Sequence, residues 1–168
     1  MQIENELIKI FSSRFSKAFE RISHSIRQLD NKQIWYRPSS SSNSVGIIVQ
    51  HLSGNLNQWV CSAIGGETFQ RNRPQEFIES EMISKREILL KITELDKKIQ
   101  SIVLQIKPEF LLSSRRIQGF DETVLSALIA ALTHFELHSG QITFLAKLML
   151  DKEYKTSWQP MNKEQGRE

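Results

Sequence analysis

Apolar residues recur at steps of three and four along four long stretches of this sequence, and that spacing decides the fold class. The longest stretch covers residues 3–29, about eight helical turns. Such a period places the apolar side chains on one face of an α-helix, whereas a half-buried strand alternates them at every second residue. No alternation of useful length occurs in the chain. We therefore predict an all-α protein, a four-helix bundle with long connections between its helices.

Local signals set the bounds of the first two helices. The first helix is predicted to close at 30–32, and the serine-rich stretch 35–43, which contains a proline, predicts a loop. Ser44 is then a suitable N-cap for a second helix over 45–64, because its hydroxyl can accept a hydrogen bond from the first turn. The glycine pair at 65–66 ends that helix, since glycine readily adopts the left-handed conformation of a helix C-terminus.

The third and fourth helices are set by a capping box and a proline. The sequence SKRE at 84–87 predicts the start of the third helix, because its serine and glutamate side chains can each bond a free backbone N–H. Pro108 stops this helix. The stretch 108–120 is predicted to be irregular, and Asp121 is the expected N-cap of a fourth helix that reaches about residue 150.

These helices predict one bundle domain over 1–158 and a polar C-terminal tail over 159–168. Two glycines, Gly46 and Gly54, lie inside the second helix, where each costs up to about 1 kcal/mol relative to alanine. A glycine within a helix permits the close approach of other atoms, so the pair indicates a crowded environment around this helix.

Charge and hydropathy argue against nucleic-acid and membrane partners. The net charge is +3, but basic and acidic residues are interleaved and no aromatic platform accompanies the arginines. No apolar run approaches the ~20 residues that cross a bilayer. The acidic N-terminus leads directly into a helical pattern, which is unlike a signal peptide. The single cysteine, Cys61, excludes an internal disulfide and fits a reducing compartment, so we predict a cytoplasmic protein.

Three of the four histidines are candidate metal ligands. His134 and His138 are four residues apart on the fourth helix, so both imidazoles lie on one face and can converge on one ion. His51 lies at the edge of the apolar face of the second helix, where a bundle can supply a further ligand. Spacing alone leaves a structural role open. His24 departs from the apolar stripe of its helix and is predicted to be solvated.

Several separated segments share a pattern with a known family. They are 35–38 (WYRP), 43–46 (NSVG), 51–59 (HLSGNLNQW), 65–67 (GGE), 71–73 (RNR), 115–119 (RRIQG) and 134–142 (HFELHSGQI). Together they resemble the DinB/YfiT-like superfamily, and more narrowly a branch of it described as a domain of unknown function. The resemblance extends over residues 3–158.

The resemblance implies a bundle in which one histidine of the second helix and two of the fourth bind a divalent metal. The matching positions are His51, His134 and His138. It also implies zinc or nickel as the metal and a homodimer as the assembly. Some relatives are thiol-dependent S-transferases or isomerases that use small cellular thiols, and many have no assigned activity. The resemblance does not select a substrate.

Three imidazole ligands leave a coordination position for water or a substrate, as in catalytic zinc sites. The leading hypothesis is a metal-dependent thiol S-transferase or hydrolase that acts on a small molecule, with a low-molecular-weight thiol as the partner. The alternative is a metal-containing binding or stress-response module without turnover. A third reading is a helical scaffold with histidines in its core. No catalytic residue is identified by the sequence.

Other polar residues are assigned around the predicted site. Asn55 and Gln141 can orient a ligand or an imidazole N–H, while Glu136 is predicted to point away. Cys61 is predicted to be a small buried residue rather than a nucleophile. Arginines of the two connectors can bind a carboxylate-bearing thiol cofactor, although solvated loop residues are the preferred interpretation. These arginines are Arg71, Arg73, Arg115 and Arg116.

Overall fold

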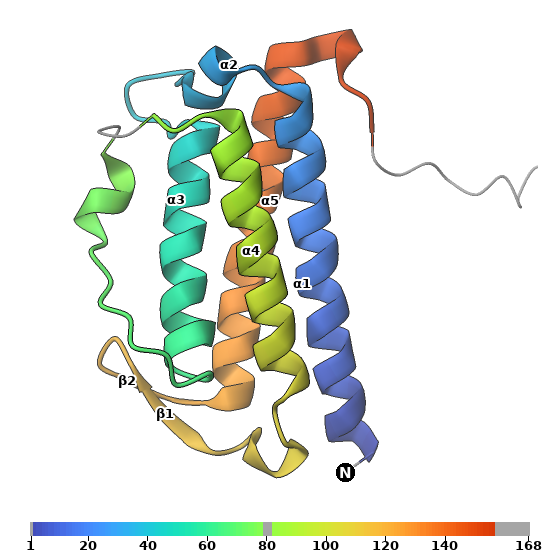
Figure 1. Cartoon of the computed structure of the whole chain (residues 1–168), viewed down its shortest axis with the longest axis vertical. Coiled ribbons are helices and arrows are strands. Elements are labelled where there is room, and N and C mark those ends of the chain that lie inside the picture. The colour runs from blue at the N-terminus through green and yellow to red at the C-terminus, as the bar shows by residue number, and fades with distance from the viewer. Residues whose placement is uncertain (1, 79–81, 157–168) are drawn as a thin grey trace, which may run out of the picture.

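Four long helices form the bundle that the apolar periodicity predicts (Figure 1). The computed structural model describes residues 2–78 and 82–156, so the predicted tail at 159–168 lies outside the described residues. The helices are α1 (Gln2–Gln28), α3 (Val45–Leu56), α4 (Lys85–Leu104) and α5 (Val124–Leu150). Their order and spacing confirm the predicted fold class.

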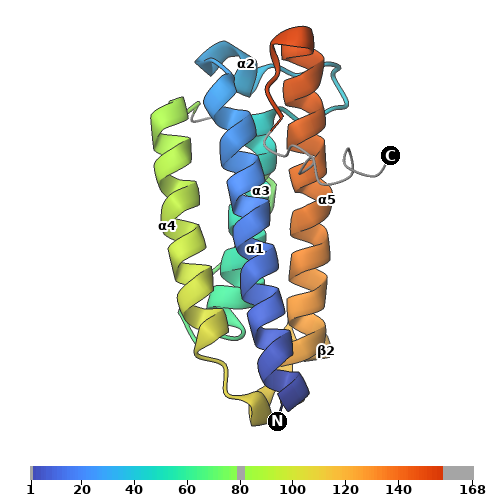
Figure 2. The same ribbon diagram turned by 90° about the vertical axis from the view of Figure 1, so that its right-hand side faces the viewer.

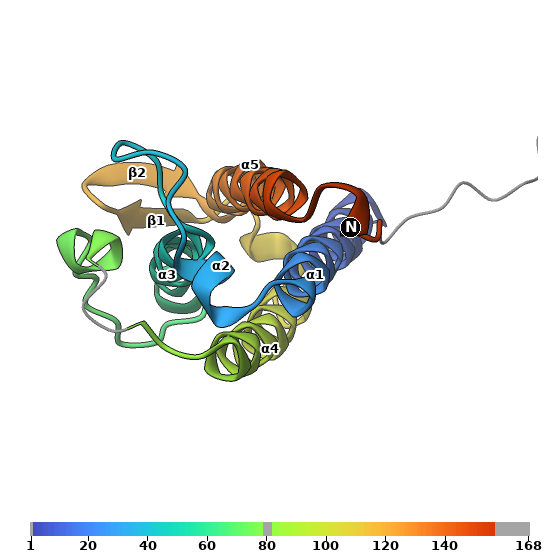
Figure 3. The same cartoon turned by 90° about the horizontal axis from the view of Figure 1, so that it is seen from above.

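The four helices do not simply alternate in direction. α1 runs upward in Figure 1, α3 and α4 both run downward, and α5 returns upward. Seen from above, α1 and α3 occupy opposite corners of the bundle, with α4 and α5 between them (Figure 3). The side view in Figure 2 shows α1 lying between α4 and α5. Because α3 and α4 are parallel, the connector between them must travel back along the outside of the bundle.

Apolar side chains from all four helices fill the centre. Phe15 and Phe19 of α1 pack on Phe135 of α5, with ring centroids 6.1 and 4.5 Å from that of Phe135. Tilted aromatic contacts of this kind add to the free energy gained by burial. The predicted apolar stripe of α1 is buried along most of its length. The core therefore depends on packing between helices and not on any single polar group.

A short helix that the sequence did not predict lies between α1 and the predicted loop at 35–43. Asp30 does not only close α1; it is also the N-cap of a short helix, α2 (Asn31–Trp35). The Asp30 carboxylate accepts a hydrogen bond from the Gln33 backbone N–H, and the Gln33 side chain bonds the Asp30 N–H in return. This reciprocal capping box stabilises a helix too short to form alone. The indole ring of Trp35 then packs against Gly46, where a Cβ would lie only 2.5 Å from it.

The second predicted helix continues beyond α3 as a π-helical turn, η1 (Asn57–Ser62). Backbone N–H groups here bond to carbonyls five residues earlier, as Ala63 does to Gln58 at 3.1 Å. Gly66 adopts a φ of 75°, which confirms the predicted glycine end of this segment. Ser44 is the N-cap of α3, as predicted.

The stretch after α4 is more ordered than predicted. A 3-10 turn, η3 (Pro108–Phe110), leads to an antiparallel hairpin of β1 (Ser114–Ile117) and β2 (Phe120–Thr123). Gln118 and Gly119 form the turn with φ values of 53° and 89°, the conformation that a two-residue hairpin requires. The prediction of an irregular segment was therefore wrong.

The predicted N-cap of the fourth helix was also wrong. Asp121 lies in β2, where its carboxylate pairs with Arg116 across the hairpin at 2.7 Å. Thr123 caps α5 instead, and its hydroxyl accepts from the Ser126 backbone N–H. Two further 3-10 turns complete the described chain, η2 (Pro74–Phe77) and η4 (Asp151–Glu153). Within residues 2–78 and 82–156, none of the helices combines the length and hydropathy needed to cross a bilayer.

Candidate metal centre

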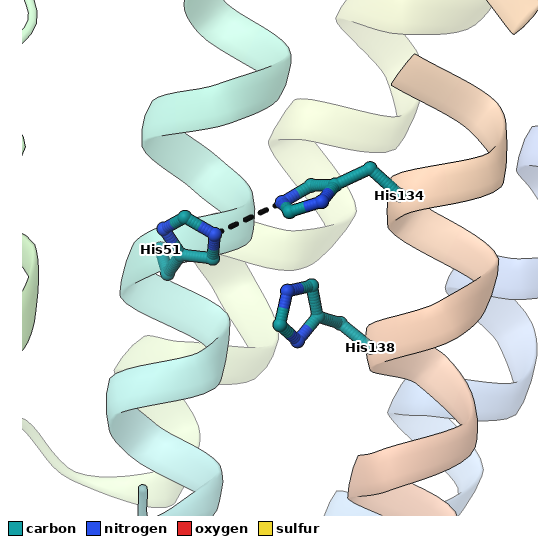
Figure 4. Close-up of side chains that lie close together, drawn as sticks. All are labelled: His51, His134 and His138. Carbon is teal, nitrogen blue, oxygen red and sulfur yellow. Dashed lines mark hydrogen bonds between the residues drawn. The ribbon is translucent and has the colours of Figure 1, made fainter. Parts of the chain in front are cut away.

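The three predicted histidines meet between α3 and α5, midway along the bundle (Figure 4). One ring nitrogen of each lies within 4.8 Å of the other two. The closest pair is Nε2 of His51 and Nε2 of His134, 2.9 Å apart. His138 adds the third ring, with its centroid 4.5 Å from that of His134 and 5.1 Å from that of His51. The three histidines singled out in the sequence therefore lie close together in the structure.

Burial favours the neutral, metal-binding form of His134 and His138. His51 is buried, whereas His134 and His138 are partly exposed on the outer side of the cluster. Burial, together with the neighbouring His138 and His51 and the guanidinium groups of Arg71 and Arg73, lowers the pKa of His134 to about 4. Burial also lowers the pKa of His138. Both rings are thus neutral near pH 7, and a neutral imidazole offers a lone pair to a borderline metal such as zinc or nickel.

A carboxylate that the sequence reasoning missed supports the buried histidine. Glu76, in the turn η2, places Oε2 2.9 Å from Nδ1 of His51. The ring of Phe77 in the same turn lies against His51, with centroids 5.1 Å apart. The connector between α3 and α4 thus returns along the bundle and covers the back of the site.

Arg71 holds this carboxylate in place. Its guanidinium donates from Nε to Glu76 Oε1 at 2.6 Å and from Nη2 to Oε2 at 2.8 Å. A two-bond fork of this kind fixes both the position and the plane of a carboxylate. Both side chains are more than nine-tenths buried. Nη1 of Arg71 also donates to Gln58, which in turn accepts from Gln118 at the tip of the hairpin.

Gly54 makes room for the Glu76 carboxylate beside α3. A Cβ built at this position would lie 1.9 Å from Glu76 Oε1 and 3.3 Å from Arg71 Nε. Any larger residue would therefore displace the carboxylate. This explains why a glycine lies inside α3. Its low helix propensity is offset because it allows the Glu76 carboxylate to approach the helix closely.

Gln141 supports His138 from within α5, as the sequence suggested. Its Oε1 lies 2.7 Å from Nδ1 of His138, three residues earlier on the same face. Asn55 lies one turn below His51 on α3 and is buried, but its Oδ1 contacts no hydrogen-bond donor among the described residues. Among the three clustered histidines, His51 and His138 each have a partner at Nδ1 within the described part of the chain.

A model of a single protein family matches almost the whole chain. It is described as "Protein of unknown function (DUF1572)" and covers residues 2–163 of the 168. The chain belongs to the DUF1572 family. Comparison of the DUF1572 chain with curated proteins found no match.

Solved structures share the fold of this DUF1572 protein at low sequence identity. A DinB-like protein from Bacillus cereus ATCC 10987 is 13% identical, with a TM-score of 0.68 over 83% of this chain and 90% of its own. A conserved protein from Enterococcus faecalis is 17% identical, with a TM-score of 0.69 over 84% and 96%. A DinB-like protein from Bacillus subtilis is 16% identical, with a TM-score of 0.67 over 90% and 99%. The fold is thus that of DinB-like proteins, which confirms the predicted resemblance.

The remaining residues singled out in the sequence lie away from the three rings. Glu136 points to α1, where it pairs with Arg21 at 2.5 Å, as its helical position predicted. Cys61 is fully buried, and burial raises the pKa of its thiol to about 11, which makes it a poor nucleophile. His24 contacts the backbone oxygen of Lys155 through Nε2 at 2.6 Å, so it secures the end of the described chain and is not simply solvated.

The four connector arginines have different roles in the DUF1572 structure. Arg71 is bound to Glu76, and Arg73 lies over the ring of Phe77 at 5.4 Å. Arg116 pairs with Asp121 in the hairpin. Arg115 borders a separate pocket between the hairpin and the end of α4. They therefore do not form one cluster that faces the histidines.

Proposed function

We propose that His51, His134 and His138 bind one divalent metal ion, zinc or nickel, and that the ion serves an enzymatic site. The observation that carries this proposal is the convergence of three ring nitrogens within 4.8 Å, supplied by two different helices. Neutral imidazoles at such spacing need only small movements to reach the ~2.0–2.1 Å bonds of a zinc–histidine site. Their Nδ1 partners, Glu76 and Gln141, are of the kind that orient metal ligands.

The partly exposed His134 and His138 leave one side of the cluster accessible. A bound ion there would acidify a water or a thiol and polarise a carbonyl, which is the chemistry of a metal-dependent thiol S-transferase or hydrolase. The chain's own contribution is to hold the three rings and to cover the opposite side with η2. The alternative, a metal-containing binding or stress-response module, uses the same ligands without turnover.

A pocket next to the site fits a small-molecule partner. It has a volume of about 570 Å³ and lies between the 41–43 loop, α3 and α5. Gln141, the partner of His138, is part of its wall, and Leu137 and Phe144 supply apolar surface. The described residues that line it include no charged side chain. Since Arg71 is also occupied by Glu76, we favour a substrate without a strong negative charge.

Activity can be tested with the metal-loaded protein and a panel of small thiols and electrophiles. We expect thiol consumption that depends on the metal and disappears in His138→Ala. In a cobalt-substituted form, an added thiol should change the visible spectrum by occupying the accessible side of the ion. If neither an added thiol nor an added carboxylate changes the visible spectrum of the cobalt form, the proposal of an open coordination site is contradicted. Thiol binding without turnover would favour the non-catalytic alternative.

We also propose that the protein forms a homodimer through the outer face of α5. Exposed apolar residues recur along this face at steps of eight, seven and four, namely Ile129, Leu137, Phe144 and Leu148. A row of exposed apolar residues along a surface helix is typical of an interaction site. A second copy packed here would also wall the pocket that Leu137 and Phe144 border.

The dimer predicts a specific effect of charge on this face. Leu148→Glu should shift the mass in light scattering at micromolar concentration from twice the 19.5 kDa chain mass to the monomer mass. The matched control is Leu90→Glu, because Leu90 is similarly exposed but lies on α4. A monomeric wild-type protein, or equal effects of both variants, would contradict the proposed face.

A further inference from the structure

We propose that Glu76 is a positioning residue of the metal centre, which holds His51 in the single tautomer whose Nε2 faces the other histidines. The inference rests on the proposed metal site and extends it to the connector between α3 and α4. Arg71 and Gly54 act with Glu76, because the first fixes the carboxylate and the second admits it beside the helix. The sequence around the three histidines gives no indication that Glu76, Arg71 and Gly54 support the site.

The direction of the hydrogen bond follows from the chemistry of the two partners. An ionised carboxylate has acceptors only, so the proton in the 2.9 Å contact between His51 Nδ1 and Glu76 Oε2 belongs to the imidazole. Arg71 Nη2 also lies 3.4 Å from His51 Nδ1, but it donates to Glu76 Oε2 at the shorter distance of 2.8 Å. A neutral imidazole carries one proton, and Nε2 of His51 is then left with its lone pair. That nitrogen is the one that lies 2.9 Å from His134.

Arg71 holds the Glu76 carboxylate beside His51 through two hydrogen bonds. Its fork donates to both carboxylate oxygens, at 2.6 and 2.8 Å, in a site where both side chains are almost completely buried. A buried ion pair adds little to stability compared with apolar residues of similar volume, because desolvation offsets most of the attraction. Its position against a candidate metal ligand gives the pair a role in orienting that ligand.

Gly54 provides an independent indication that the carboxylate has a fixed place. The helix α3 would gain up to about 1 kcal/mol from alanine at this position. Alanine would however place Cβ 1.9 Å from Glu76 Oε1, a carboxylate that cannot swing away while Arg71 holds it. At the point where the carboxylate approaches His51, α3 thus contains glycine, although alanine has the higher helix propensity.

The tautomer also defines the metal-free state of the site. Because His51 Nε2 has a lone pair, the proton in its short contact with His134 must belong to His134 Nε2. To offer Nε2 to a metal ion as well, His134 would have to carry its proton at Nδ1. No net change in protonation is needed, so His51 is preorganised while His134 adapts.

Two variants separate this role from a merely structural one. Arg71→Met combined with Glu76→Leu removes both charges together and so leaves neither buried alone. Gly54→Ala displaces the carboxylate while raising helix propensity. Its matched control is Gly140→Ala on α5, where a Cβ would meet no described atom within 4 Å.

Nitrogen-15 NMR of the histidines in the metal-free protein tests the tautomer directly. We expect His51 to be protonated at Nδ1 in the wild type and in Gly140→Ala, and to show a mixture of tautomers in the other two variants. Cobalt(II) affinity, measured by competition with a chelator, should fall about 10- to 100-fold in those two variants and stay unchanged in the control.

The outcomes distinguish this inference from the metal proposal. A wild-type His51 protonated at Nε2, or variants that bind cobalt as tightly as the wild type, would overturn the role of Glu76 while the metal site stands. A wild type that binds no cobalt would overturn the metal site, and the NMR measurement would still decide whether Glu76 sets the proton on His51.

Discussion

Alanine in place of either His134 or His138 is expected to remove the metal from the purified protein. The wild type should contain close to one zinc or nickel ion per chain by elemental mass spectrometry. Each substitution deletes one of the three ligands that we propose among the described residues. Loss of a residue that only supports a ligand lowers the metal affinity about 10- to 100-fold, so loss of a ligand itself should lower the affinity by more than that. We expect less than about one tenth of an ion per chain in either variant.

His24→Ala is the matched control for these two variants. It removes a histidine from α1, where the ring contacts the Lys155 backbone and no member of the cluster. Its metal content should equal that of the wild type. Equal metal content in wild type, His134→Ala and His138→Ala would show that the ion is bound elsewhere or not specifically.

Removal of the metal by a chelator is expected to lower the melting temperature by about 5 to 10 °C while the helical circular dichroism persists. A ligand at 100 times its Kd stabilises the folded state by about 2.7 kcal/mol, and a chain of this size shifts by about 2–4 °C per kcal/mol. The bundle does not need the ion to fold, because apolar residues from all four helices fill its core. A zinc finger, whose metal provides the folding free energy, behaves differently.

The double variant His134→Ala/His138→Ala is the control for this measurement, since its melting temperature should be insensitive to chelator. Global unfolding of the wild type on chelation would make the ion a structural element. An unchanged melting temperature in a protein that demonstrably loses its metal would show that the folded and unfolded chains bind it equally well.

The helices and most of their caps could be predicted from the sequence because they depend on nearby residues. Apolar spacing in α1 and α5 requires only the 3.6-residue period, and the hydroxyls of Ser44 and Ser84 bond backbone groups three residues away. The same locality placed His134 and His138 on one face, since four residues make slightly more than one helical turn.

Short local elements were harder to recognise. The two strands of the hairpin have four residues each, too few to show alternation, and β2 is mostly polar. The signal that was present is the dipeptide Gln118-Gly119, because glycine after a polar residue suits a two-residue turn. The prediction of Asp121 as a helix cap rests on the frequency of aspartate at such caps, whereas its pairing with Arg116 places it in the strand.

The sequence by itself determined that the protein is a helical bundle with two histidines on one helical face, because helix period and capping act within a few residues. The tertiary structure decided that His51 meets them across the space between α3 and α5, 83 residues away along the chain. It also decided that Arg71 and Glu76 lie behind His51 and that Gly54 admits them. Those contacts arise because α3 and α4 run parallel, which forces their connector back along the bundle past the histidines.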